Sequence, residues 1–176
     1  MISLMEQLGV YWTVNFGNHD SEAYSFYDRE DVSGFYSDED LEYCLYQAGP
    51  EDVDGYGNHT IRVENSKGIT THALVLMDSH SYTDGDIFGI FWKYDNIHQN
   101  QVDWYESEII RISQKNKDVI MDNFEGKKKK TLLEDYYPVK STAYFHIPLV
   151  EMREAWEELE ANDFKDTEDI KYIGGI

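Results

Sequence analysis

Four consecutive residues, Gly17-Asn18-His19-Asp20, place an amide, an imidazole and a carboxylate side by side. They follow an apolar stretch at 10–16 whose β-branched and aromatic residues predict a buried strand. Because ligands of open α/β sheets bind just outside the carboxyl ends of strands, this polar triplet is a candidate site. The alternative is a simple turn, since Gly17 permits a sharp change of direction and Asn and Asp tolerate unusual backbone angles.

The chain has six histidines. Two of them, His19 and His146, stand in polar turns at the carboxyl ends of predicted apolar strands, and His80 follows a third such strand. These three are therefore the histidines best placed for chemistry. The others are expected to be surface, core-edge or solvated residues: His59, His72 and His98.

The composition fits one globular domain over residues 1–176, because 41% of the residues are hydrophobic and the length allows a sizeable core. Acidic residues outnumber basic ones by 35 to 15, which gives a formal net charge of -20. Such a chain repels phosphate backbones, so we expect no general nucleic-acid binding. An excess of carboxylates does suit hard cations.

Cys44 is the only cysteine, so the sequence predicts no intramolecular disulfide and no cysteine-based metal site. Its neighbours include no basic residue, which argues against a nucleophilic role. No apolar run approaches the length of a membrane span, and no signal peptide is recognisable at Met1. We therefore expect a reducing, cytoplasmic location without membrane contact.

Apolar periodicity and capping residues predict an α/β domain built in layers. Strands are expected at 10–16, 59–64, 70–77 and 141–145, with a hairpin loop at 65–68. Helices are expected at 1–8, 21–27, 37–48, 100–117 and 149–160. The segments 28–35 and 118–140 are expected to be irregular, the second with a solvated lysine run at 127–130.

Five segments, taken in their order along the chain, resemble motifs of one enzyme family. They are the Gly-Asn-His-Asp motif at 17–20, the glycine-rich turn at 55–59, the strand and Asp-Ser turn at 74–79, the Gln-x-x-Trp helix start at 101–104 and the His-Ile-Pro segment at 146–148. The family is the calcineurin-like metallophosphoesterases, in the branch of the purple acid phosphatases. The resemblance covers nearly the whole chain and implies a layered α-β-β-α sandwich.

The resemblance implies a phosphoester hydrolase that uses two metal ions to hold the phosphate and to lower the pKa of a bound water. Asn18 and His146 resemble two ligands of the second metal ion, and manganese, iron or zinc would suit them. His19 resembles the histidine that donates a proton or a hydrogen bond beside the scissile phosphate. Asp20 would hold the His19 ring in its tautomer and keep it basic.

Several family motifs have no counterpart in this sequence. The Asp-x-His and Gly-Asp-x-x-Asp segments that precede Gly-Asn-His-Asp are missing, and so is the Gly-His-x-His segment that follows. Asp78-Ser79-His80 has the Asp-x-His spacing but stands on the wrong side of the motif, so we expect a structural or rim role for His80. We therefore expect the central portion of the sandwich, incomplete at both ends, with little activity of its own.

Two other functions stay open. A degenerate relative could keep the scaffold and bind a partner without catalysis. A calcium-binding domain would use the acidic charge and the Asp84-Gly85-Asp86 loop, although no twelve-residue ligand loop is present. In an incomplete sandwich the strand 10–16 would present an open apolar edge, so we also expect self-association.

Overall fold

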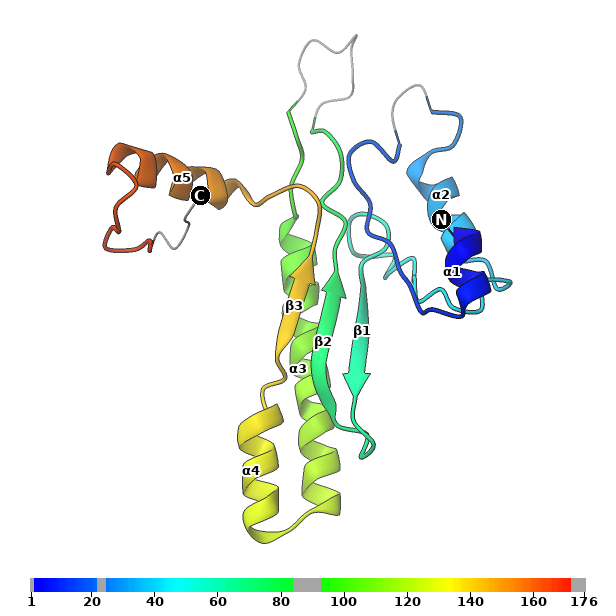
Figure 1. Cartoon of the computed structure of the whole chain (residues 1–176), viewed down its shortest axis with the longest axis vertical. Coiled ribbons are helices and arrows are strands. Elements are labelled where there is room, and N and C mark those ends of the chain that lie inside the picture. The colour runs from blue at the N-terminus through cyan, green and yellow to red at the C-terminus, as the bar shows by residue number, and fades with distance from the viewer. Residues whose placement is uncertain (1, 22–24, 84–92, 172–176) are drawn as a thin grey trace.

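The computed structural model describes residues 2–21, 25–83 and 93–171 (Figure 1). In chain order these residues form α1 (Ile2–Leu8), α2 (Arg29–Tyr36), β1 (His59–Glu64), β2 (Thr70–Leu76), α3 (Gln99–Asn123), α4 (Gly126–Tyr136), β3 (Ser141–Tyr144) and α5 (Val150–Ala161). The Asp84-Gly85-Asp86 loop lies outside the described residues. Within the described ranges, no helix combines the length and the apolar character that crossing a bilayer requires.

The three strands form one sheet in the order β1-β2-β3. β1 and β2 are an antiparallel hairpin in which Thr60 lies opposite Val75. The hairpin turn is closed by a hydrogen bond from Gly68 N to Asn65 O (3.0 Å), and the φ of +73° at Gly68 favours glycine. β3 runs parallel to β2, with Ala143 opposite Val75. Figure 1 shows α3 running along one face of this sheet.

The core lies between β2 and α3. Its buried apolar side chains come from both elements and from the segments beside them: Ala73, Val75, Met77, Ile97, Ile112 and Val139. Burying one such isoleucine stabilises the fold by about 2 kcal/mol. The side chain of Asn116 on α3 also pairs with both the N–H and the C=O of Thr70, each at 2.8 Å. This polar pair fixes α3 against the start of β2.

Five of the sequence-based predictions are confirmed, although the bounds of the elements shift. They are the N-terminal helix α1, the β1–β2 hairpin, the long helix α3, the strand β3 and the last helix α5. The mixed α/β class is confirmed as well. The described strands make one small sheet with α3 packed on it. The two-sheet sandwich therefore stays a prediction.

The segment 10–16 does not form the predicted strand. Among the described residues it makes one isolated bridge, which joins Trp12 to Cys44. Phe16 is 2% exposed and packs against the ring of Tyr36 with 6.2 Å between the ring centroids. Trp12 and Phe16 are therefore buried against another ring, that of Tyr36, while Tyr11 is 68% exposed. The segment lacks a continuous strand partner, which β propensity alone cannot supply.

The helix predictions around residue 37 are wrong. α2 forms where an irregular segment was expected, because Asp28 and Asp31 make a capping box with N–H to carboxylate distances of 2.9 and 3.2 Å. Ser37 ends α2 and does not begin a helix. The expected helix at 37–48 is replaced by turns, since residues 43–45 bond to the backbone of Trp12 instead.

The lysine run 127–130 belongs to a helix, which corrects the expected loop. α4 begins at Gly126 and includes all four lysines, three of which are exposed. Lysine is a good helix former, and Lys128 lies over the ring of Phe124 at 5.1 Å. The expected helix at 21–27 falls partly on 22–24, outside the described residues, and 25–28 is not helical.

Candidate functional site

The Gly17-Asn18-His19-Asp20 segment is a tight turn held from two sides. Gly17 N donates to Asp20 Oδ2 at 2.6 Å, and Asp20 N donates to Gly17 O at 3.3 Å. Arg29 Nη2 also donates to Gly17 O, at 3.0 Å. The Asp20 carboxylate therefore fixes the turn itself. The expected role of Asp20 in holding the His19 ring stays a prediction. His19 itself lies on the exposed side of the turn.

The structure brings Asn18 and His146 into direct contact although 128 positions separate them. His146 Nε2 lies 2.9 Å from Asn18 Oδ1. Since an amide oxygen can only accept, the imidazole donates and its proton is on Nε2. Asn18 is 4% exposed, and its Nδ2 donates to the Tyr82 hydroxyl at 2.8 Å. Both polar atoms of the Asn18 side chain are thus held in place.

Gly17 is needed for this contact. A Cβ atom at Gly17 would lie 3.2 Å from both Cδ2 and Nε2 of His146, closer than most real Cβ contacts. The His146 ring therefore packs directly on the backbone of the turn. A side chain at position 17 would require the ring to shift by a few tenths of an ångström.

The end of β3 is anchored so that His146 faces the turn. Met77 N donates to Tyr144 O at 2.9 Å, which extends the β2–β3 pairing. Ile147 N donates to Ser79 Oγ at 2.8 Å, and Asn15 Nδ2 donates to Tyr144 O at 3.1 Å. His146 is thus flanked on both sides by backbone groups whose partners lie in other segments.

Beneath the turn lies a buried charge pair between Arg29 of α2 and Asp78 after β2. Arg29 Nη1 lies 2.6 Å from Asp78 Oδ1, and Asp78 is fully buried. The same carboxylate accepts hydrogen bonds from Tyr56 N and His80 N, both at 2.9 Å. Arg29 also bonds to Gly17 O, so it connects the turn to the end of β2.

Gln101 at the start of α3 completes this network. Its Nε2 donates to Asn58 Oδ1 at 2.9 Å and to Asp78 O at 2.7 Å, and its Oε1 accepts from His98 N at 2.8 Å. Gln101 is fully buried. We refer to Arg29, Asp78, Asn58 and Gln101 as the Arg29 network.

Sequence reasoning did not identify Arg29 as part of the site. One signal was available, because Arg29 is the only cation in the run Asp28-Arg29-Glu30-Asp31. What could not be read from the sequence is that α2 folds back onto both Gly17 and Asp78.

The other histidines have structural partners. His80 stacks on His98 with 4.1 Å between the ring centroids, and His80 Nε2 lies 3.1 Å from Gln101 Oε1. The expectation that His98 is merely solvated is wrong, since it bonds to Asp54 (2.7 Å) and Asp95 (3.1 Å). The hydrogen bond that His98 Nδ1 donates to the Asp54 carboxylate raises the pKa of His98 above its usual value. His59 is buried, which lowers its pKa.

Asn18 and His146 have a spacing that two neighbouring metal ligands could adopt. In octahedral geometry, neighbouring ligand atoms about 2.1 Å from a metal ion lie about 3 Å apart. The 2.9 Å between Asn18 Oδ1 and His146 Nε2 agrees with this geometry. In the part of the chain that the structure describes, no group of three or more His, Cys, Asp or Glu residues could hold a metal ion. The pair therefore fits two positions of a larger ligand set.

In sequence the chain is similar to two curated proteins of Arabidopsis thaliana. It is 34% identical over 108 residues to "Probable inactive purple acid phosphatase 14", a match that covers 56% of this chain and 25% of that protein. It is 25% identical over 163 residues to "Probable inactive purple acid phosphatase 28", covering 85% of this chain and 36% of that protein. The chain thus spans about a quarter to a third of the length of these relatives.

These similarities point to the metallophosphoesterase superfamily. Within it, they point to purple acid phosphatase-like proteins whose names describe them as inactive. No family model matches the chain. No solved structure matches it either.

Proposed function

We propose that the chain is the scaffold of a purple acid phosphatase-like domain in which Asn18 and His146 bind one metal ion together. The observation that carries the proposal is the 2.9 Å contact between Asn18 Oδ1 and His146 Nε2. A neutral oxygen and an imidazole nitrogen suit manganese, iron or zinc. To bind the metal ion, the His146 ring would take the tautomer with its proton on Nδ1, so the metal would replace the hydrogen bond to Asn18. The relatives named as purple acid phosphatases support the same family.

A metal pair in such a site would polarise a phosphoester and lower the pKa of a bound water. The chain's own residues position that chemistry. Tyr82 and the tight turn orient the Asn18 amide, so that its oxygen faces His146. His19 follows on the exposed side of the turn, where we expect it to donate a hydrogen bond to a phosphate oxygen.

We infer that these residues alone bind phosphoester and metal without efficient hydrolysis. A two-metal mechanism needs about seven or eight ligands, and the described residues supply one pair that fits. The names of both relatives include the word inactive, which favours a non-catalytic scaffold. A phosphoester hydrolase to which this chain contributes part of the metal centre is the second candidate, and the exposed His19 beside Asn18 favours it.

Two measurements on the chain separate these functions. Isothermal titration with Zn²⁺ should show weak binding that is lost in Asn18→Ala and in His146→Ala. His72→Ala is the matched control, because His72 is bonded to Thr142 on the sheet and is expected to leave binding unchanged. If all three variants bind Zn²⁺ alike, the proposal that Asn18 and His146 bind one metal ion together is wrong.

The second measurement is hydrolysis of p-nitrophenyl phosphate with added manganese, zinc or iron. We expect turnover no greater than that of the His146→Ala variant. Turnover comparable to that of a complete metallophosphoesterase, abolished by His146→Ala, would reject the non-catalytic function and establish the hydrolase.

A further inference from the structure

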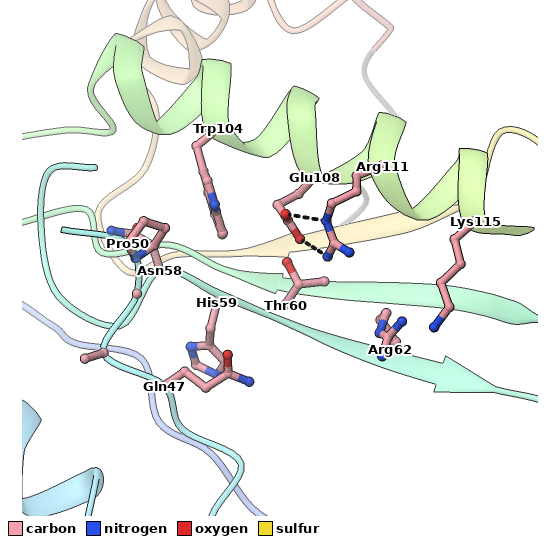
Figure 2. A pocket seen from close by; sticks show the side chains of 12 residues that line it. Gln47, Pro50, Asn58, His59, Thr60, Arg62, Trp104, Glu108, Arg111 and Lys115 are labelled. Carbon is pink, nitrogen blue, oxygen red and sulfur yellow. Dashed lines mark hydrogen bonds and ion pairs between the residues drawn. The ribbon is translucent and has the colours of Figure 1, made fainter. Parts of the chain in front are cut away.

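A cavity of about 750 Å³ lies between α3 and β1, away from the turn at Gly17 (Figure 2). One wall is a stripe of four α3 side chains: Trp104, Glu108, Arg111 and Lys115. Their spacing of three or four residues places them on one face of the helix. The floor includes Thr60 and Arg62, which lie on the face of β1 toward α3. We call this cavity the α3–β1 groove.

One end of the groove is basic. Arg62, Arg111 and Lys115 gather there, in a chain whose net charge is -20. Arg111 Nε and Nη2 donate to the Glu108 carboxylate at 2.9 and 2.7 Å. These bonds occupy one edge of the guanidinium and hold its plane, so its remaining donors are presented in a fixed direction.

The other two cations are held loosely. Arg62 and Lys115 share one carboxylate, Glu64, at 3.3 and 3.8 Å. All three side chains are at least one third exposed, so these ion pairs contribute little and exchange readily for a stronger anion. The three cations exceed the two carboxylates by one charge, which favours an anionic group at this end.

The other end of the groove is aromatic. In Figure 2 the ring of Trp104 hangs from α3 toward Pro50, and both residues line the groove. An indole face is a good surface for stacking a planar base. Arg111 follows Trp104 by seven residues on the same helix, which corresponds to a rise of about 10 Å. A nucleoside monophosphate can span that separation.

Thr60 lies between the two ends. Its Oγ1 is shielded from solvent and has no hydrogen-bond partner among the residues that the structure describes. Because this oxygen is closed off from solvent, a ligand in the groove would contact other atoms of Thr60, and ligand binding there does not depend on this hydroxyl.

We propose that the α3–β1 groove binds a nucleoside monophosphate, with the base stacked on Trp104 and the phosphate held by Arg111, Arg62 and Lys115. This site is separate from the Asn18–His146 pair and does not depend on the proposed metal. It would give an acidic protein a specific place for a small phosphorylated ligand.

The test is calorimetric titration of the intact chain with AMP, adenosine and inorganic phosphate at low salt. We expect AMP to bind at least about tenfold more tightly than either fragment, because it occupies both ends of the groove. In ¹H–¹⁵N spectra AMP should shift the Trp104 indole N–H signal. The double variant Arg62→Gln/Lys115→Gln should weaken AMP binding by about tenfold or more.

Lys127→Gln/Lys130→Gln on α4 is the matched control, since it removes the same charge at a distance from the groove. It is expected to change AMP binding less than twofold. AMP that fails to bind at millimolar concentration, or that binds no better than phosphate, overturns the proposal. Equal losses in the two double variants would also overturn it, because they would show non-specific attraction to positive charge.

Discussion

Arg29 and Arg111 both pair with a carboxylate, but the two pairs differ in burial. Arg29 lies 2.6 Å from Asp78, and the two side chains are 12% and 0% exposed. Arg111 lies 2.7 Å from Glu108, and those side chains are 58% and 20% exposed. The distances are nearly equal, so distance does not distinguish the roles. The buried pair holds three segments together beneath the candidate site, whereas the exposed pair can accept a further anion.

The sharpest test of this comparison is to remove each arginine. Arg29→Ala would leave the buried Asp78 carboxylate without its cation, which is expected to cost about 3–5 kcal/mol of unfolding free energy. Arg111→Ala should cost less than about 1 kcal/mol, because an exposed pair contributes little. Urea unfolding followed by circular dichroism measures both. Similar losses in the two variants would contradict the distinction.

The next largest effect is expected at Gln101, the member of the Arg29 network on α3. Gln101→Ala would leave Asn58 Oδ1, Asp78 O and His98 N without this partner in the interior, at a cost of about 2–3 kcal/mol. Gln99→Ala is the control, since Gln99 bonds to Asp103 on the exposed side of the same helix. A cost at Gln99 as large as that at Gln101 would show that helix propensity, not the network, is being measured.

A smaller effect is expected at Gly17, where the turn contacts His146. Gly17→Ala should cost about 1–2 kcal/mol, because the new methyl group meets the imidazole ring at 3.2 Å. Gly34→Ala in α2 has open space around its Cβ and should instead stabilise the chain by about 0.5–1 kcal/mol. The comparison uses urea midpoints of both variants. If Gly17→Ala is neutral, the ring does not pack on the turn.

The smallest expected effect is the pH dependence at His98. Its pKa is raised, chiefly by the hydrogen bond that it donates to Asp54, so its contribution to stability is complete below the unfolded pKa of about 6.5. That contribution is lost as the pH rises through the folded pKa. The excess stability of the wild type over His98→Asn should therefore be larger at pH 5.5 than at pH 8.

His59 should show the opposite pH dependence. Burial lowers its pKa, so its contribution is present above about pH 6.5 and is lost as the pH falls through the folded value. His59→Asn should therefore reduce the loss of stability toward acid pH.

The outcome that would contradict the ion pairs of His98 is the reverse pH dependence of its own variant. In that case the excess stability of the wild type over His98→Asn would grow toward pH 8.

Local sequence signals predicted the elements that need few distant partners. The alternation in β1 and the helical period of α3 depend on neighbours in the chain, and both elements were predicted correctly. Ser37 and the acidic residues after it also form a good local helix start, yet no helix forms there. The bonds from residues 43–45 to Trp12 join distant segments, and a local pattern cannot reveal them.

The same limit applies to the candidate site. The resemblance to a family, not any local pattern, connected Asn18 with His146, and the structure places these two side chains in contact. Arg29 was missed because its importance comes from its simultaneous contacts with Gly17 and Asp78. The roles of His19 and Asp20, and self-association through the segment 10–16, stay predictions.

The most direct test of the central claim is paramagnetic broadening by Mn²⁺ in ¹H–¹⁵N spectra of the chain. We predict that the Asn18 side-chain amide and the backbone signals of residues 145–147 broaden at lower Mn²⁺ concentrations than those of the acidic helix α5. The preference should disappear in His146→Ala. Broadening that begins on the acidic surface and reaches Asn18 and His146 last would contradict the proposed metal pair.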